Sequence, residues 1–101
     1  MYLVVFRNRK RPDMDEAAYA AESARMEELA RAQPGYRSFK SYTAEDGEVV
    51  AVSEWDSEDA ALDWGWHEEH RAAQARGRTD YYASYTLFAC DAPRIHQFPR
   101  P

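Results

Sequence analysis

The sequence predicts an α+β domain in which strands and helices follow one another in the order βαββαβ. Four segments are rich in β-branched and aromatic residues, as strands are, and two Ala-, Glu- and Arg-rich segments carry apolar residues at helical spacing. The connections between them are short and contain glycine or proline. This order is typical of the ferredoxin-like fold, a four-stranded antiparallel sheet with both helices on one face. A chain of 101 residues fits one such domain.

The first strand and the first helix have clear boundaries. Residues 2–8 (YLVVFRN) read as a strand that ends in charged residues before Pro12. Asp13 is the expected N-cap of the helix, with Glu16 three residues later in the spacing of a capping box. Pro34-Gly35 ends the helix.

A hairpin follows the first helix. Residues 36–44 alternate polar and aromatic side chains, and residues 48–55 (EVVAVSEW) are β-branched. Between them, Glu45-Asp46-Gly47 supplies the residue types of a hairpin turn.

The second helix and the last strand complete the domain. Asp56 or Ser57 can cap a helix that runs to about Arg76 and ends at Gly77. Residues 80–90 (DYYASYTLFAC) form the fourth strand. We expect a domain over residues 1–90 and an irregular C-terminal tail over residues 91–101, which either wraps a partner subunit or is disordered.

Charge and composition exclude several functions. The net charge of -5 argues against nucleic-acid binding, which depends on Lys and Arg at phosphates. The basic run at residues 7–11 is expected to be a solvated strand exit, with an anion site as the alternative. No apolar run approaches the ~20 residues that span a bilayer, and no cationic leader precedes the first strand, so we expect no membrane contact and a cytoplasmic location. The single cysteine, Cys90, is expected to be a small core residue of the last strand.

The aromatic content, 14% of the residues, exceeds what a core of this size needs. The sheet has a second face that the helices leave uncovered, and it would carry a set such as Tyr36 and Tyr42, or Tyr81 and Tyr85. Because a monomer rarely exposes such a patch, we expect two sheets to pair face to face in a homodimer.

Residues 61–70 (ALDWGWHEEH) concentrate tryptophan and histidine on the second helix. Successive helical residues advance by about 100°, so Trp64 and Trp66 point about 200° apart and cannot share one buried face. We expect Trp64 to point inward and Trp66 to lie at a rim or, if Gly65 kinks the helix, beside it.

Trp64, His67, His70 and Gln74 form a polar and aromatic stripe on this helix. The simpler interpretation is a buried tryptophan with exposed histidines beside it, and the alternative is a stripe that lines a site between helix and sheet. The two histidines could share a metal ion, but no third ligand has suitable local spacing, so no metal is expected. A histidine there could act as an acid or base near neutral pH.

Residues 49–64 (VVAVSEWDSEDAALDW), followed by HEEHRAAQARGR and YYASYTLF, resemble the antibiotic biosynthesis monooxygenase (ABM) family of dimeric α+β barrels. The resemblance extends over the chain up to Cys90 and includes the break at Pro34-Gly35-Tyr36. It implies a dimeric barrel, and it allows either a cofactor-free oxygenase of phenolic or quinol-type aromatics or a haem-binding, haem-degrading enzyme.

The haem-degrading branch has an asparagine near the end of the first strand, a tryptophan in the second helix and a histidine ten residues later. Asn8 and Trp64 match the first two positions. Gln74 occupies the third, which argues against haem ligation by this route, although His70 lies one turn earlier and could replace it.

The resemblance therefore favours a cofactor-independent monooxygenase that uses O₂ on a small aromatic substrate. A haem-binding or haem-degrading protein is the first alternative, and a non-catalytic dimeric ligand-binding module is the second. The expected catalytic residues are Asn8 as a donor to developing negative charge, Trp64 as a flat wall, and His70 or His67 as the base. The expected substrate-binding residues are Phe6, Gln74 and Tyr82.

Overall fold

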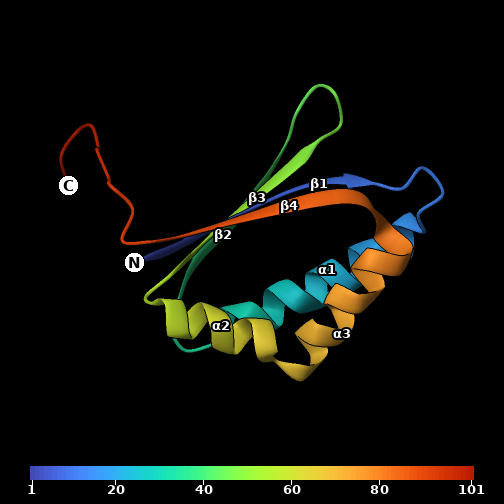
Figure 1. Ribbon diagram of the computed structural model, residues 1–101, viewed down its shortest axis with the longest axis horizontal. Coiled ribbons are helices and arrows are strands. Elements are labelled where there is room, and N and C mark those ends of the chain that lie inside the picture. Colours follow the sequence, from blue (N-terminus) through green and yellow to red (C-terminus); the bar gives the residue numbers. More distant parts are fainter.

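The computed structural model describes all 101 residues and has the predicted ferredoxin-like architecture. Four strands form one antiparallel sheet in the order β2-β3-β1-β4, and all three helices lie on one side of it (Figure 1). No helix is long and apolar enough to span a membrane. The elements are β1 (Tyr2–Lys10), α1 (Glu16–Arg31), β2 (Tyr36–Thr43), β3 (Val49–Trp55), α2 (Glu58–Trp66), α3 (Glu68–Arg76), a π-helical turn (Gly77–Tyr81) and β4 (Tyr82–Asp91).

Helix α1 begins two residues later than predicted. Asp15 is the N-cap, and its side chain accepts a hydrogen bond from the Ala18 amide at 3.0 Å. The prediction of Asp13 as the cap is wrong, because the Asp13 carboxylate is instead paired with Arg11 at 3.1 Å. Both aspartates stand before a helix-forming segment, and only the ion pair with Arg11 distinguishes them.

The second predicted helix is two helices. The helix is interrupted at His67, which lies between α2 and α3 and has an extended backbone (φ −57°, ψ 131°). Gly65 lies inside α2 and does not break the helix. No proline or glycine stands at or directly beside His67, so the position of the interruption could not be predicted from local helix propensity. Ser57 caps α2 by accepting a hydrogen bond from the Ala60 amide at 3.2 Å.

The junction between α1 and β2 requires a glycine at position 35, where the sequence predicted the end of the helix. Gly35 has φ +84°, and a Cβ atom there would stand 2.5 Å from the Cβ of Ala60 in α2. Both the backbone conformation and the close approach therefore exclude a side chain. This contact sets α2 close against the start of β2, as Figure 1 shows for the two segments.

The strand register assigns side chains to two faces of the sheet. On the covered face, which we define by Tyr2, Val4, Phe6, Asn8 and their cross-strand partners, side chains point toward the helices. On the outer face, Phe88, Val5 and Val52 form a row across three strands.

Two expectations, one about the tyrosines of the outer face and one about Cys90, are wrong. Of the tyrosines proposed for it, only Tyr42 lies there, whereas Tyr36 and Tyr85 belong to the covered face and Tyr81 is buried. Cys90, predicted to be a core residue, is exposed on the outer face, because it lies on an edge strand opposite Leu3. The alternation within a strand identifies two sets of side chains but does not say which set meets the helices.

Trp55, at the end of the sheet where β1 begins, is the best-buried large side chain. Its side chain is 2% exposed, its indole stacks near Trp64 of α2 and meets the Tyr36 ring edge-on, and its Nε1 donates to Ser53 at 3.2 Å. Few other side chains are this well covered; Ala30 and Tyr81 complete the buried apolar set. Asn8 and Tyr81 are buried at the opposite end of the sheet, so the layer between helices and sheet is packed at both ends.

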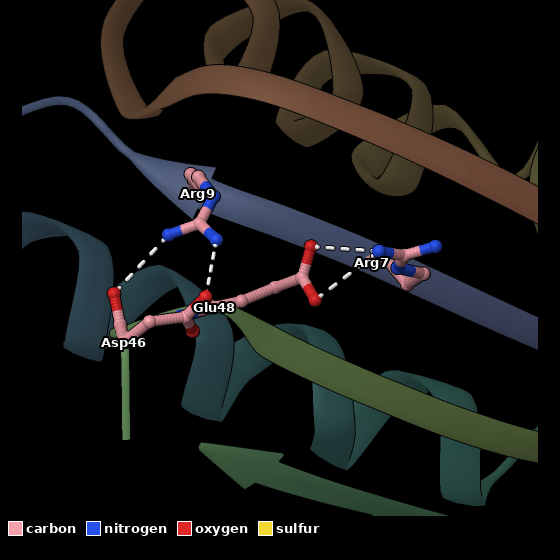
Figure 2. Close-up of polar contacts among 4 residues, drawn as sticks. All are labelled: Arg7, Arg9, Asp46 and Glu48. Carbon is pink, nitrogen blue, oxygen red and sulfur yellow. Dashed lines mark hydrogen bonds and ion pairs between the residues drawn. The ribbon is translucent and has the colours of Figure 1, made fainter. Parts of the chain in front are cut away.

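The three arginines of the basic run at the end of β1 are solvated, as predicted, whereas Lys10 is half-buried. Arg7 pairs with Glu48 at 3.2 Å and Arg9 pairs with Asp46 at 2.7 Å (Figure 2). Both acceptors belong to the segment between β2 and β3, so these pairs link β1 to the hairpin on the outer face. Both arginines are about half exposed, so each pair contributes little to stability.

Candidate functional site

The other three residues of the predicted stripe, His67, His70 and Gln74, gather around Trp64. The His70 ring lies flat on the indole, with ring centroids 4.1 Å apart and an angle of 11° between the planes. His67 lies 5.5 Å from the same indole, measured between ring centroids. Gln74 extends the group by donating from Nε2 to the Gly65 carbonyl at 3.1 Å. The stripe is therefore one cluster, which we call the Trp64 cluster.

The protonation state of His70 follows from its contacts. Nδ1 lies 2.9 Å from the Trp64 carbonyl, which can only accept, so Nδ1 carries the hydrogen and Nε2 carries the lone pair. Gln74 Nε2 is 3.3 Å from the same Nδ1, but both nitrogens are donors, so this is a contact and not a hydrogen bond. Burial lowers the pKa of His70 below its ordinary 6.5, and the charge of His67 acts in the same direction. His70 is thus a neutral imidazole near pH 7, with Nε2 able to take up a proton.

His67 and Trp66 have opposite surroundings. The Nδ1 atom of His67 is buried and has no hydrogen-bond partner in the chain. Trp66, as predicted, does not share the face of Trp64: it is 68% exposed and lies against the Arg71 guanidinium, 5.1 Å from the ring centroid. No third His, Cys, Asp or Glu side chain joins His67 and His70 in a metal-binding group.

The other predicted site residues gather around Asn8, at the far end of β1. Asn8 is only 4% exposed, and its Oδ1 accepts a hydrogen bond from Lys10 Nζ. The Phe6 ring lies 5.2 Å from both the Tyr82 and the Tyr85 ring, measured between centroids. We call this group, with Tyr19 of α1, the Asn8 cluster. Sequence reasoning did not select Lys10, because a lysine in a basic run gives no sign of pointing toward the helices.

The two clusters lie on the same face of the sheet, and α3 extends from one toward the other. Trp55, which stacks on Trp64, is opposite Tyr2, and Asn8 is six residues, or about 20 Å, further along β1. Helix α3 continues from His70 to its C-cap Gly77, whose backbone packs on the Tyr82 ring, so His70 and Gln74 lie between Trp64 and the Asn8 cluster. The covered face between the clusters consists of small and apolar side chains that are only half-buried, namely Val4, Phe6, Ala51 and Ser53. The helices therefore do not seal this part of the sheet.

Gln74 does not fit the ligand position of the haem site that the resemblance allows. Gln74 occupies the ligand position, and its amide is held by the Gly65 carbonyl. Proteins hold haem iron through His, Cys, Met or Tyr, not through a carboxamide. His70 is the remaining candidate ligand, because its Nδ1 donates to the Trp64 carbonyl and its Nε2 keeps a lone pair.

A four-stranded antiparallel sheet with helices on one face, and with polar and aromatic side chains between the two layers, places the chain among the ferredoxin-like α+β proteins. Within that class the match is specific: residues 1–76 match the family described as antibiotic biosynthesis monooxygenase. The chain belongs to this family, as the sequence resemblance indicated.

Similar proteins extend the comparison to most of the chain. YqjZ of Bacillus subtilis (strain 168), an uncharacterised protein, is 36% identical over 97 residues, which are 96% of this chain and 83% of YqjZ. Rv0793 of Mycobacterium tuberculosis has a similar structure, with a TM-score of 0.79, 23% identity and coverage of 95% of this chain and 98% of Rv0793. SnoaB of Streptomyces nogalater, a cofactor-independent oxygenase, has a TM-score of 0.75 at 17% identity, covering 98% of this chain and 97% of SnoaB. At these identities the two structures show a shared fold.

Proposed function

We propose that this protein is a cofactor-independent monooxygenase that oxidises a small phenolic or quinol-type aromatic with O₂. The observation that carries the proposal is the neutral, half-buried His70 imidazole, which lies flat on Trp64 with Nε2 unprotonated. Family membership and the fold shared with the cofactor-independent oxygenase SnoaB support it.

The reaction needs a base but no external reductant. His70 Nε2 takes the phenol proton, and the resulting anion passes an electron to O₂. The radical pair combines into a C–O bond, and the peroxide takes the proton back from His70. Loss of water then converts the ring C–H into a carbonyl. The substrate gains one oxygen, loses two hydrogens and supplies all four electrons that reduce O₂.

The remaining site residues bind the substrate and stabilise its charge. The Asn8 amide nitrogen makes no hydrogen bond within the chain, so it can donate to the substrate oxygen as negative charge develops. Phe6 and Tyr82 supply ring faces beside Asn8, and Trp64 supplies one beside His70. Gln74 fixes the backbone at Gly65, and His67 is the alternative base.

Oxygen uptake with a panel of phenols and quinols tests the function. We expect consumption of one O₂ per substrate without added cofactor. Asn8→Ala should lower turnover about a hundredfold, because it removes one donor to the developing charge. Trp64→Phe should lower turnover less, since it keeps a smaller ring. Unchanged turnover in both folded variants would refute these roles, and no uptake across the panel would refute the function.

A hemin titration separates this proposal from the haem alternative. We expect no saturable change in the Soret band beyond that of free hemin. One hemin bound per subunit, and lost in His70→Ala, would instead favour haem binding. If the protein binds aromatic ligands but consumes no O₂ and binds no hemin, it is a ligand-binding module.

We also propose that two copies pair through the outer face. Its central row is apolar on three strands, at Phe88, Val5 and Val52, and ends at Lys40 of β2; Phe88 is 51% exposed in the single chain. An exposed apolar sheet face of this kind is typical of a subunit interface. Light scattering after size exclusion should give the mass of a dimer, and Val5→Arg should shift it to that of a monomer. A wild-type monomer at micromolar concentration would contradict the proposal.

A further inference from the structure

Lys10 differs from the other cations of the basic run. Arg7, Arg9 and Arg11 each form an ion pair with a carboxylate, and all three are substantially exposed. Lys10 is half-buried on the covered face, and no carboxylate lies within ion-pair distance of it. A partly desolvated ammonium without a counter-ion is unfavourable unless something else compensates the charge.

The surroundings of Lys10 hold it in place without neutralising it. Nζ donates to the buried Asn8 Oδ1 and lies 5.0 Å from the centroid of the Tyr19 ring and 5.3 Å from that of Tyr82. Ring faces attract the ammonium and leave its charge intact. The lysine is therefore held by contacts from β1, α1 and β4, and none of these contacts supplies an anion.

Glu22, the carboxylate that acts on the Tyr82 hydroxyl, already has hydrogen-bond partners. Glu22 of α1 accepts from Arg76 Nε at 2.8 Å and from the Tyr81 hydroxyl at 2.9 Å. Tyr82 is not an anion either, because burial, reinforced by the nearby Tyr19, holds the pKa of its hydroxyl above the ordinary value. Neither Glu22 nor Tyr82 supplies the missing negative charge.

We propose that Lys10 is the anion-binding group of this site and that its ammonium holds the substrate's phenol oxygen in the ionised form that proton transfer to His70 produces. This inference rests on the proposed function and specifies its substrate: a phenol acidic enough to be held as phenolate. The ammonium stabilises the phenolate and lowers the pKa of the bound phenol. Asn8 has two parts in this arrangement: Oδ1 orients Lys10, and the amide nitrogen is left free to donate to the same oxygen. Phe6 and Tyr85 supply the apolar side of the site.

The test uses 4-nitrophenol, whose phenol and phenolate forms absorb at different wavelengths and which ionises near neutral pH. The apparent pKa of the protein-bound probe should lie about one pH unit below that of the free probe, which is a tenfold preference for phenolate. Lys10→Met should abolish this difference, and Lys10→Arg should retain most of it. Lys10→Gln, which keeps a donor for Asn8 without the charge, gives the same answer if Lys10→Met does not fold.

Arg78→Met is the matched control, because it removes one positive charge from an exposed side chain that makes no ion pair. We expect it to bind the probe as the wild type does. The inference is overturned if the wild-type protein does not bind the probe, if the bound pKa equals the free one, or if Lys10→Met and Lys10→Gln keep the difference.

Measuring oxygen uptake as well distinguishes failure of the anion site from failure of the proposed function. A phenolate preference that depends on Lys10, together with no O₂ consumption, refutes the oxygenase and leaves the anion site. O₂ consumption with unchanged probe binding and turnover in Lys10→Met refutes the anion site and leaves the oxygenase.

Discussion

Trp55→Ala is expected to lower the free energy of unfolding by about 3–5 kcal/mol, the usual cost of removing a large buried aromatic side chain. Trp55 is the best-buried large side chain, and its loss opens space between Tyr36, Trp64 and the Ser53 hydroxyl. Domains of this kind have a total stability of about 5–15 kcal/mol, so the variant should be close to its unfolding limit at room temperature. Urea unfolding followed by circular dichroism measures the change.

Trp66→Ala is the matched control, since it is the same substitution at a tryptophan that is 68% exposed. We expect a cost of about 1 kcal/mol or less, mostly from the lost contact with the Arg71 guanidinium. Equal losses in both variants would contradict the place of Trp55 in the core.

His70→Gln is expected to lower turnover by about 10²–10⁴-fold, the usual contribution of a positioned general base. The wild-type rate should also fall on acidification, because the imidazole must be neutral to accept the phenol proton. Burial lowers the pKa of His70 below 6.5, so the protonated, inactive form accumulates only below that pH. The rate–pH profile of the wild type should therefore lose activity below pH 6.5, and the residual activity of His70→Gln should lack this limb.

His96→Gln, in the exposed C-terminal segment, is the control for this prediction, and it should leave both rate and pH profile unchanged. His67→Gln distinguishes the two candidate bases. A large loss in His67→Gln together with near-normal turnover in His70→Gln would transfer the role of base to His67.

Much of the arrangement of the candidate site could be predicted because its residues are close together on one helical segment. Trp64, His67, His70 and Gln74 are spaced by three or four residues, and helical geometry brings such positions to one side. The break at His67 does not separate them, since His70 still stacks on Trp64 across it. The separation of Trp64 from Trp66 also followed from the 100° advance per residue.

The direction of the Lys10 side chain could not be predicted, and the reason shows where prediction from sequence ends. The sequence shows five consecutive residues, Arg7 to Arg11, of which four are basic, and such a run is usually solvated. The strand register and a shift in pairing between Arg9 and Lys10 decide that Lys10 points toward α1 while its neighbours meet the acids of the hairpin. Those contacts join residues far apart in the chain, so no local pattern contains them.

The sequence by itself determined the order and type of the elements, the glycine at the start of β2, the Trp64 stripe and the family. All of these depend on local propensity, on periodicity or on motifs within a short stretch of chain. Only the tertiary structure decided which face of each strand meets the helices, and with it the exposure of Cys90, the burial of Asn8 and the surroundings of Lys10. The physical reason is that a strand has two equivalent sets of side chains, and only long-range pairing and helix packing choose between them.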